Sequence, residues 1–174
     1  MTRPSGTPAL ALLQARGVAH TVHTYAIDEP SGAAAHRGER TPYGVAAAAA
    51  LGVSPARLFK TLVLVLEGGR AGGELVLAVV PSDATLSERA VAQALGAKRA
   101  ELASEAQVQR ATGSVPGGVS PLGSRKAMRT LIDVSAEGFT TLLVSAGRRG
   151  LAVELAPADL ATLSTASYAP IAVK

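Results

Sequence analysis

The stretch Leu58–Glu67, with the sequence LFKTLVLVLE, decides the fold more clearly than any other part of the chain. It is an almost continuous apolar run rich in valine and leucine, and Glu74–Pro81, ELVLAVVP, has the same character. Short apolar runs of this length, bounded by turn residues, are typical of buried β-strands. Four glycines lie in the segment between the two runs. The sequence therefore predicts two neighbouring strands joined as a hairpin.

Lys60 is the exceptional residue of the first predicted strand. Alternate side chains of a strand share a face, so Lys60 falls in line with the leucines at 58, 62, 64 and 66. A lysine at this place either carries its charge to the rim of the sheet or points into a cavity. Thr61 faces the opposite side if the strand is regular there. These two residues are the first candidates for a functional site.

A long glycine loop forms the second informative region, Thr112–Ile132, TGSVPGGVSPLGSRKAMRTLI. Gly117, Gly118 and Gly123 permit positive φ angles and close backbone approach. Such a loop can aim several backbone N–H groups at a carbonyl oxygen or a phosphate, and three basic residues follow it. It can also be no more than a tight connection between two elements, and both interpretations stay open.

The remaining segments mix helical and strand-like patterns. Capping residues and amphipathic or alanine-rich patterns predict helices at 7–16, 45–51, 86–95, 105–112 and 158–163. Strands are expected at 18–26, 98–102, 127–134, 140–145, 151–155 and 168–173, with a turn at 146–150 and a polar loop at 28–40. Helices and strands do not alternate strictly, which favours an α+β protein with a mixed sheet or barrel over a doubly wound parallel sheet. We expect a single domain spanning 1–174, because no repeat or linker divides the chain.

The composition of the 174 residues narrows the class of protein. Hydrophobic residues make up 48% and charged residues 17%, which is globular, and no segment has the unbroken apolar length of a membrane span. The absence of cysteine excludes disulfides, thiolate metal sites and a cysteine nucleophile. With no signal-peptide pattern at the start, we expect a cytoplasmic protein without membrane partners. The net charge of +4 makes a polyanionic partner plausible, although an ordinary solvated surface explains it as well.

Most standard catalytic signatures are missing. The sequence holds no GxSxG elbow, Walker loop, Rossmann fingerprint or HExxH helix. His20 and His23 are three residues apart on a predicted strand and point to opposite faces, and His36 falls in a loop, so we expect no metal site. A serine triad built on Ser120 is disfavoured but open, since its partners would meet only in space. Ser145 and the turn after it could bind an anion or form an ordinary hairpin.

Five motifs together resemble the YbaK family. They are HTY at 23–25, YG at 43–44, FKTLV at 59–63, TGSVPGGVSPLG at 112–123 and VSAGRRGL at 144–151. The family comprises free-standing aminoacyl-tRNA deacylases related to the editing domain inserted in bacterial prolyl-tRNA synthetases. The resemblance covers nearly the whole chain, with an extra stretch near 30–41, and implies a mixed, β-barrel-like sheet flanked by helices.

The resemblance also implies a reaction and a site. The reaction is hydrolysis of misacylated tRNA, most typically Cys-tRNA(Pro), in which the thiol of the substrate attacks its own ester, with no cofactor and no metal. Lys60 matches the lysine required for activity. The residues implied to bind the substrate come from the motifs quoted above: Tyr25, Tyr43, Thr61, Gly117, Gly118, Ser120, Ser145 and Gly147. The implied partners are the 3′ end of aminoacyl-tRNA and prolyl-tRNA synthetase, and the oligomeric state is not predicted.

Two positions depart from the family pattern. Many relatives carry a polar residue where this chain has Ala152, and a glycine where it has Ala146. Both are expected to lie next to the pocket, so editing of alanyl-tRNA, or broad deacylation of small amino acids, stays open as an alternative. A non-catalytic module that binds tRNA or nucleotides is the alternative of another class.

Overall fold

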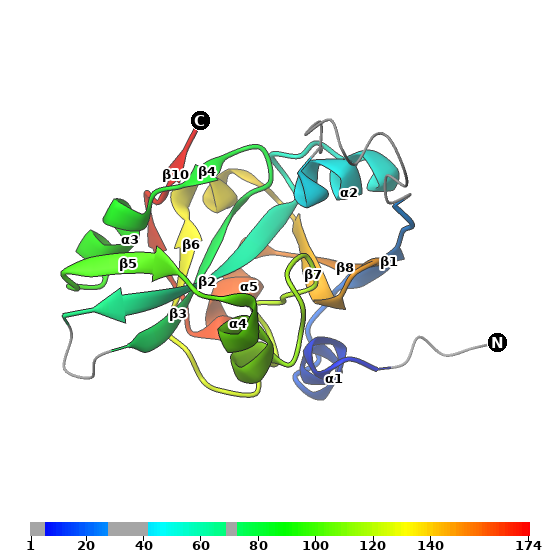
Figure 1. Cartoon of the computed structure of the whole chain (residues 1–174). Helices are drawn as coiled ribbons and strands as arrows, with labels where there is room; N and C mark the ends of the chain where they lie inside the picture. Colours follow the sequence, from blue (N-terminus) through cyan, green and yellow to red (C-terminus); the bar gives the residue numbers. More distant parts are fainter. Residues whose placement is uncertain (1–5, 28–41, 69–72) are drawn as a thin grey trace, which may run out of the picture.

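The computed structural model describes residues 6–27, 42–68 and 73–174 (Figure 1). Its helices are α1 Pro8–Ala15, α2 Tyr43–Leu51, α3 Glu88–Ala94, α4 Glu105–Thr112, α5 Pro157–Ser164 and the 3₁₀ turn η2 Val134–Gly138. Its strands are β1 Thr21–Thr24, β2 Phe59–Glu67, β3 Glu74–Pro81, β4 Thr85–Leu86, β5 Arg99–Leu102, β6 Thr130–Asp133, β7 Leu142–Arg148, β8 Leu151–Leu155, β9 Ser167–Ala169 and β10 Ala172–Val173. Helices cover mixed sheets, as the sequence predicted.

The predicted hairpin is the centre of the largest sheet. β2 and β3 pair antiparallel without interruption, from Phe59 opposite Pro81 to Leu66 opposite Glu74. The full strand order is β5-β2-β3-β6-β9, in which β6 lies parallel to β3 and β9 parallel to β6. The pairing is thus mixed, because the last two strands arrive through crossovers rather than hairpins.

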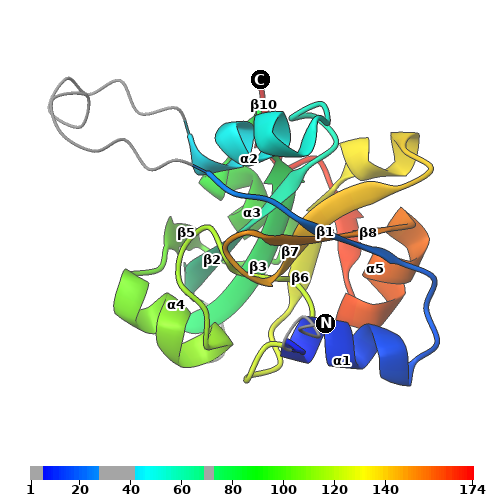
Figure 2. The ribbon, with the colours of Figure 1, turned by 90° about the vertical axis from the view of Figure 1, so that its right-hand side faces the viewer.

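A smaller antiparallel sheet, β1-β8-β7, stands against the first. Figure 2 shows it facing the viewer, between α2 above and α1 below. A parallel bridge between Leu58 and Leu143 joins the beginning of β2 to β7, so the two sheets meet at one edge. This junction gives the arrangement its barrel-like character. The short strands β4 and β10 pair separately.

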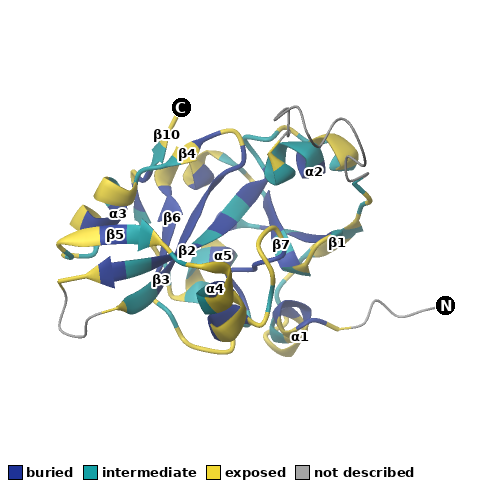
Figure 3. Ribbon diagram, in the orientation of Figure 1, coloured by how far each residue is buried: buried dark blue, intermediate teal, exposed yellow. Residues whose placement is uncertain are grey.

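The two faces of the large sheet bury different cores, and its strands β3 and β6 are almost wholly buried (Figure 3). On the face towards the small sheet, Phe59, Val79 and Ile132 pack with α1, α5 and β7–β8. On the other face, Leu64 and Val80 pack against α3. A leucine or phenylalanine buried in this way stabilises the fold by about 1.5–3 kcal/mol. The beginning of β2 lies between these two cores, at the junction of the two sheets.

Several predicted boundaries are wrong, each for a local reason. The residues 146–150 do not form one turn: β7 continues to Arg148 through a break in register after Ser145, with Gly147 at φ 108°. The strand expected at 168–173 is interrupted at Pro170 and becomes β9 and β10, which belong to different sheets. The strands expected at 18–26 and 127–134 are each reduced to four residues. The loop expected at 28–40, the extra stretch near 30–41 and His36 lie outside the described residues.

Candidate active site

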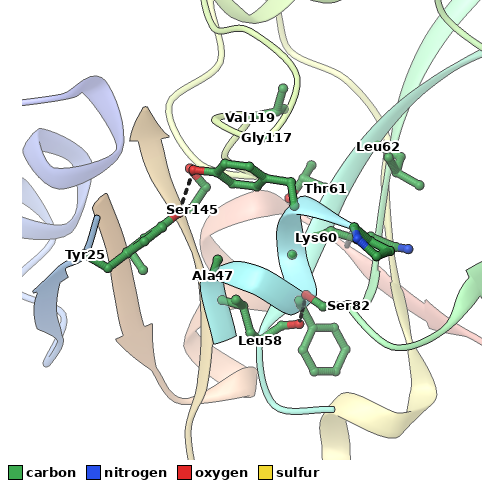
Figure 4. Close-up of a pocket in the computed structure, with 15 residues that line it drawn as sticks. Tyr25, Ala47, Leu58, Lys60, Thr61, Leu62, Ser82, Gly117, Val119 and Ser145 are labelled. Atoms are coloured by element: carbon green, nitrogen blue, oxygen red, sulfur yellow. Dashed lines mark hydrogen bonds between the residues drawn. The ribbon is translucent and has the colours of Figure 1, made fainter. Parts of the chain in front are cut away.

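A cavity of about 190 Å³ opens where the two sheets meet (Figure 4). Six of the nine residues implied by the family motifs line it: Tyr25, Tyr43, Lys60, Thr61, Gly117 and Ser145. They come from the end of β1, the start of α2, the start of β2, the glycine loop and β7. The fold therefore gathers into one place residues that are up to 120 positions apart in the sequence.

The cavity exists because β2 is paired along only part of its outer edge. β5 pairs with Leu64–Glu67 and stops, and β7 meets the strand only at Leu58, which leaves the edge of β2 open between these two points. On the β5 side, the carbonyls of Val63 and Glu67 accept hydrogen bonds from Ala103 and Lys98. Backbone groups alternate along a strand with a period of two residues, so the N–H and C=O of Thr61 point to this same side. They lie beyond the end of β5, towards the cavity.

Lys60 and Thr61 have opposite orientations, as predicted, because the register of β2 with β3 is unbroken here. The Nζ of Lys60 donates a hydrogen bond to the carbonyl oxygen of Ala84, at 2.7 Å. Burial lowers the pKa of Lys60, and the charge of Asp83 opposes this effect. In Figure 4, Lys60 lies on the right of the view, whereas Tyr25 and Ser145 lie on the left.

The hydroxyl of Thr61 is the unusual polar group of the cavity. The residue is only 9% exposed, and its Oγ1 has no hydrogen-bond partner within the described part of the chain. A buried hydroxyl without a partner costs about 1–3 kcal/mol. A ligand that bonds to this hydroxyl would recover that energy.

The two tyrosines form the opposite wall. Their hydroxyl groups are 3.1 Å apart and share one hydrogen bond, so one phenolic proton is left for a third group. Burial, together with this hydrogen bond, raises the pKa of Tyr25. Tyr25 is therefore a neutral hydrogen-bonding group at pH 7 and not an anion.

Arg149 holds this wall against the glycine loop. Its guanidinium lies 5.0 Å from the centre of the Tyr43 ring, and its Nε donates to the carbonyl oxygen of Pro116 at 2.9 Å. A Cβ at Gly117 would lie 3.0 Å from this Nε and 3.1 Å from the Tyr43 ring. Gly117, at φ 86°, is therefore required both for the backbone conformation and for the close contact.

The remaining predicted residues lie outside the cavity. Gly118 has no positive φ, and its N–H donates to Val115, so it serves close approach to the backbone of Arg149 rather than binding through its amide. Ser120 and Gly147 line a different cavity behind the loop. Ser120 is 5% exposed, and its Oγ accepts a hydrogen bond from the amide of Leu122, which is not the arrangement of a nucleophile. Ser145 does line the first cavity, and its Oγ accepts a hydrogen bond from the amide of Gly147, at 3.2 Å.

Ala152 and Ala146, which depart from the family pattern, have different surroundings. Ala152 lines the cavity together with Ala47 and Leu58, so this part of the wall is apolar and made mostly of small side chains. Ala146 follows Ser145, which lines the cavity, but its own side chain does not line it. It faces the core beneath β7 with Leu13 of α1, because successive residues of a strand alternate between faces.

Sequence reasoning missed two further contacts. The hydroxyl of Ser82 lines the cavity and donates to the carbonyl oxygen of Leu58, at 2.6 Å. A Cβ at Gly44 would lie 2.6 Å from that hydroxyl oxygen, so only glycine lets α2 approach so closely. The YG pair at 43–44 was a signal for Gly44, whereas Ser82 had none. Within the described ranges, no three His, Asp, Glu or Cys residues are placed to hold a metal ion, and no helix is long and apolar enough to cross a membrane.

Comparison with known proteins agrees with these motifs. The chain is 36% identical over 127 residues to a protein of Enterococcus faecalis named as a Cys-tRNA(Pro)/Cys-tRNA(Cys) deacylase, EbsC, covering 73% of this chain and 75% of that protein. It is 34% identical over 118 residues to YwhH of Bacillus subtilis, covering 68% and 72%. It is also 32% identical over 103 residues to the proline–tRNA ligase of Stenotrophomonas maltophilia, covering 59% of this chain but 18% of the ligase.

Solved structures show the same fold. A crystal structure described as a trans-editing enzyme for prolyl tRNA synthetase superimposes with a TM-score of 0.78 at 22% identity, covering 100% of both chains. The protein APE2540 gives a TM-score of 0.78 at 23% identity, covering 96% of this chain and all of that one. The family model of the aminoacyl-tRNA editing domain matches residues 39–163. The resemblance drawn from the five motifs is thus confirmed, and the chain belongs to the aminoacyl-tRNA editing domain family.

Proposed function

We propose that this protein removes a wrongly attached amino acid from tRNA, with Cys-tRNA(Pro) as its substrate. The observation that carries the proposal is the cavity at the open edge of β2, which Lys60, Thr61 and Gly117 all line. Its volume of about 190 Å³ leaves room for a small group such as an aminoacyl ester. The family and the 36% identity to a protein named as a Cys-tRNA(Pro)/Cys-tRNA(Cys) deacylase support the same reaction.

The chemistry would come from the substrate. Its thiol sulfur attacks the ester carbonyl carbon, the bond from that carbon to the ribose oxygen breaks, and the thiol proton passes to the leaving ribose oxygen. The products are free tRNA and a cyclic thioester, which water then opens. The protein needs no nucleophile of its own, because holding two groups of one molecule in a reactive conformation can lower the barrier by several kcal/mol.

The residues of the cavity supply positioning and charge in this scheme. The ammonium of Lys60 uses one of its three protons on Ala84, which leaves two for the ribose or the ester oxygen. The backbone N–H of Thr61 and its unpartnered hydroxyl offer two further contacts on the other side of β2. Negative charge that develops on the carbonyl oxygen would be stabilised by donors of this kind, fixed in place before the reaction.

The apolar wall favours a second candidate, the editing of alanyl-tRNA(Pro). Ala152 is 1% exposed and presents a methyl group where many relatives have a polar side chain. A wall of Ala47, Leu58 and Ala152 accepts a small side chain without recognising its sulfur. Discrimination between such similar side chains through packing alone is worth only about 1–3 kcal/mol.

The test is deacylation of cysteinyl- and alanyl-tRNA(Pro), measured side by side with the wild type and with Lys60→Ala. Faster loss of the cysteinyl ester, abolished by the substitution, is the expected result. Faster loss of the alanyl ester would move the enzyme to the second candidate. Binding of tRNA without cleavage of either ester would make the protein a binding module.

The thiol mechanism and the synthetase partner have separate tests. A seryl ester on the same tRNA should be cleaved far more slowly than the cysteinyl ester, and equal rates would refute attack by the thiol. Prolyl-tRNA synthetase is proposed as a partner because a proline–tRNA ligase contains a region similar to this chain. Addition of the synthetase should then raise the preference for tRNA(Pro).

A further inference from the structure

A second cavity, of about 210 Å³, lies behind the glycine loop. It is bounded by the beginning of α1, the end of α4, the loop residues Ser120 and Leu122–Arg125, and Gly147. Figure 2 shows the loop between α4 and β6 passing beside α1. The approach is close: a Cβ at Gly123 would lie 2.6 Å from the carbonyl carbon of Pro8. None of the residues of the first cavity lines this one.

Two serine hydroxyls of this cavity are buried and able to donate. The Oγ of Ser124 is inaccessible to solvent and has no hydrogen-bond partner in the described part of the chain. The Oγ of Ser120, a residue only 5% exposed, accepts from the amide of Leu122 at 3.2 Å, so its own proton remains to be donated. Buried donors without an acceptor are costly, and a ligand that supplies acceptor oxygens would satisfy both.

The beginning of α1 adds a third donor. Thr7 caps this eight-residue helix by accepting from the amide of Leu10, at 3.3 Å, and its carbonyl accepts from Ala11. Pro8 has no N–H, so the first N–H left for a partner outside the helix is that of Ala9. Pro8 and Ala9 both line the cavity. The positive end of the helix dipole therefore faces the same space as the two serines.

The charged group that lines the second cavity is positive. Arg125 is the single charged residue that lines it among those the structure describes, and no carboxylate does. Gly113, at φ 76°, makes room for this arginine, since a Cβ there would lie 2.8 Å from its Nε. A guanidinium, two hydroxyls and a helix N-terminus are acceptor-seeking groups that together match the oxygens of a phosphate.

We propose that the second cavity binds a backbone phosphate of the same tRNA strand whose aminoacyl end occupies the first. This inference rests on the proposed function. The two cavities lie on either side of one short segment, because Ser145 lines the first, Gly147 lines the second, and the amide of Gly147 donates to Ser145. Two residues of chain span at most about 7 Å, so the two cavities are neighbours. A phosphate close to the aminoacyl end of the same strand is therefore within reach.

The test compares two substrates that carry the same amino acid. One is a 3′-aminoacyl adenosine without phosphate, and the other is the same ester at the end of a trinucleotide. In the wild type, the phosphates should lower KM about tenfold, the equivalent of one charge-assisted hydrogen bond. Ser124→Ala and Arg125→Gln should each remove this gain and leave kcat/KM for the aminoacyl adenosine unchanged.

Arg110→Gln is the matched control, because Arg110 is exposed on α4 and lines neither cavity. The Arg110 variant should keep the full decrease in KM that the substrate phosphates give. If it loses as much as the Ser124 and Arg125 variants, the phosphates are attracted by the overall positive charge and not bound at one site. Slowing of both substrates by the Ser124 and Arg125 variants would also overturn the proposal. A titration with inorganic phosphate, followed by the amide NMR shifts of Ala9 and Ser124, tests the cavity independently.

The comparison of substrates and the phosphate titration distinguish failure of the phosphate site from failure of the proposed function. Absence of shifts would overturn the phosphate site. Shifts without any gain from the substrate phosphates would assign the cavity to free phosphate and overturn its assignment to tRNA. If the wild type cleaves neither ester, the proposed function fails, whereas the titration still decides whether the cavity binds phosphate.

Discussion

The two halves of β2 have the same kind of sequence but different surroundings. From Leu64 to Glu67 the strand is paired on both edges, with β3 and β5, and its leucines are buried beneath α3. From Lys60 to Leu62 it pairs with β3 and lies open on its other edge, between the Leu58–Leu143 bridge and the hydrogen bond from Ala103 to Val63, and here the candidate site has formed. The difference comes from the length of β5, which stops at Leu102. A continuous apolar strand therefore borders the candidate site where its neighbour ends.

The largest effect is expected from Lys60→Ala, in the open half. Loss of the ammonium should lower kcat/KM for deacylation by roughly 10²–10³-fold, the usual effect of removing a donor that stabilises developing charge. Thermal unfolding should change little, because the substitution removes a half-buried charge whose described partner is one carbonyl. Lys98→Ala, on an exposed lysine beside the paired half, is the control and should leave the kinetics intact.

In the paired half, Leu64→Ala should have the opposite outcome. Leu64 is fully buried, so its truncation should lower the free energy of unfolding by about 2–5 kcal/mol. Activity per folded molecule should stay within a few-fold of the wild type. Urea denaturation and single-turnover kinetics on the same preparation measure both quantities. A loss of activity without a loss of stability in Leu64→Ala would contradict the assignment of this half of β2 to the core and of the other half to the candidate site.

Thr61→Val sharpens the comparison within the open half. The two side chains have nearly the same volume, but valine lacks the hydroxyl that has no partner. The free energy of unfolding should stay equal or rise by about 1 kcal/mol, because a costly buried polar group disappears. Deacylation should slow by about tenfold if that hydroxyl contacts the substrate. Thr61→Ser keeps the hydroxyl and should retain most of the activity.

The smallest effect is a shift in pH dependence. Burial lowers the pKa of Lys60, so its ammonium is lost at a lower pH than for a free lysine. The proposed reaction needs the charged form of Lys60. We therefore expect kcat/KM to fall as the pH rises through the pKa of Lys60, which lies below the ordinary lysine value of 10.5. In Lys60→Arg this alkaline decrease should disappear, since arginine stays charged. Spontaneous ester hydrolysis, measured without enzyme, must be subtracted at each pH.

The elements that could be predicted from the sequence are those decided by local pattern. The β2–β3 hairpin, α4 and β8 follow from apolar runs, capping residues and turn glycines that act over a few positions. The motifs also named six residues that the fold assembles into one cavity. Their assembly was implied by the family resemblance and not by any spacing along the chain.

What could not be predicted depends on contacts between distant segments. The position of Arg149 over Tyr43 and the burial of Ser120 follow from how the glycine loop packs, and the approach of Gly44 to Ser82 follows from how α2 packs against the end of β3. The orientation of Ala146 depends on the register of β7 with β8. No local pattern of the sequence contains this information.

The tyrosine pair has a practical consequence for spectroscopy. The chain contains three tyrosines and no tryptophan, and two of the three, Tyr25 and Tyr43, form one wall of the candidate site. Intrinsic fluorescence of the unmodified protein is thus dominated by phenol groups, most of which would touch a bound ligand. Their shared hydrogen bond and the guanidinium stacked on Tyr43 would both be disturbed by an occupant. Tyrosine emission therefore offers a label-free signal of site occupancy, with Tyr168 as the invariant background.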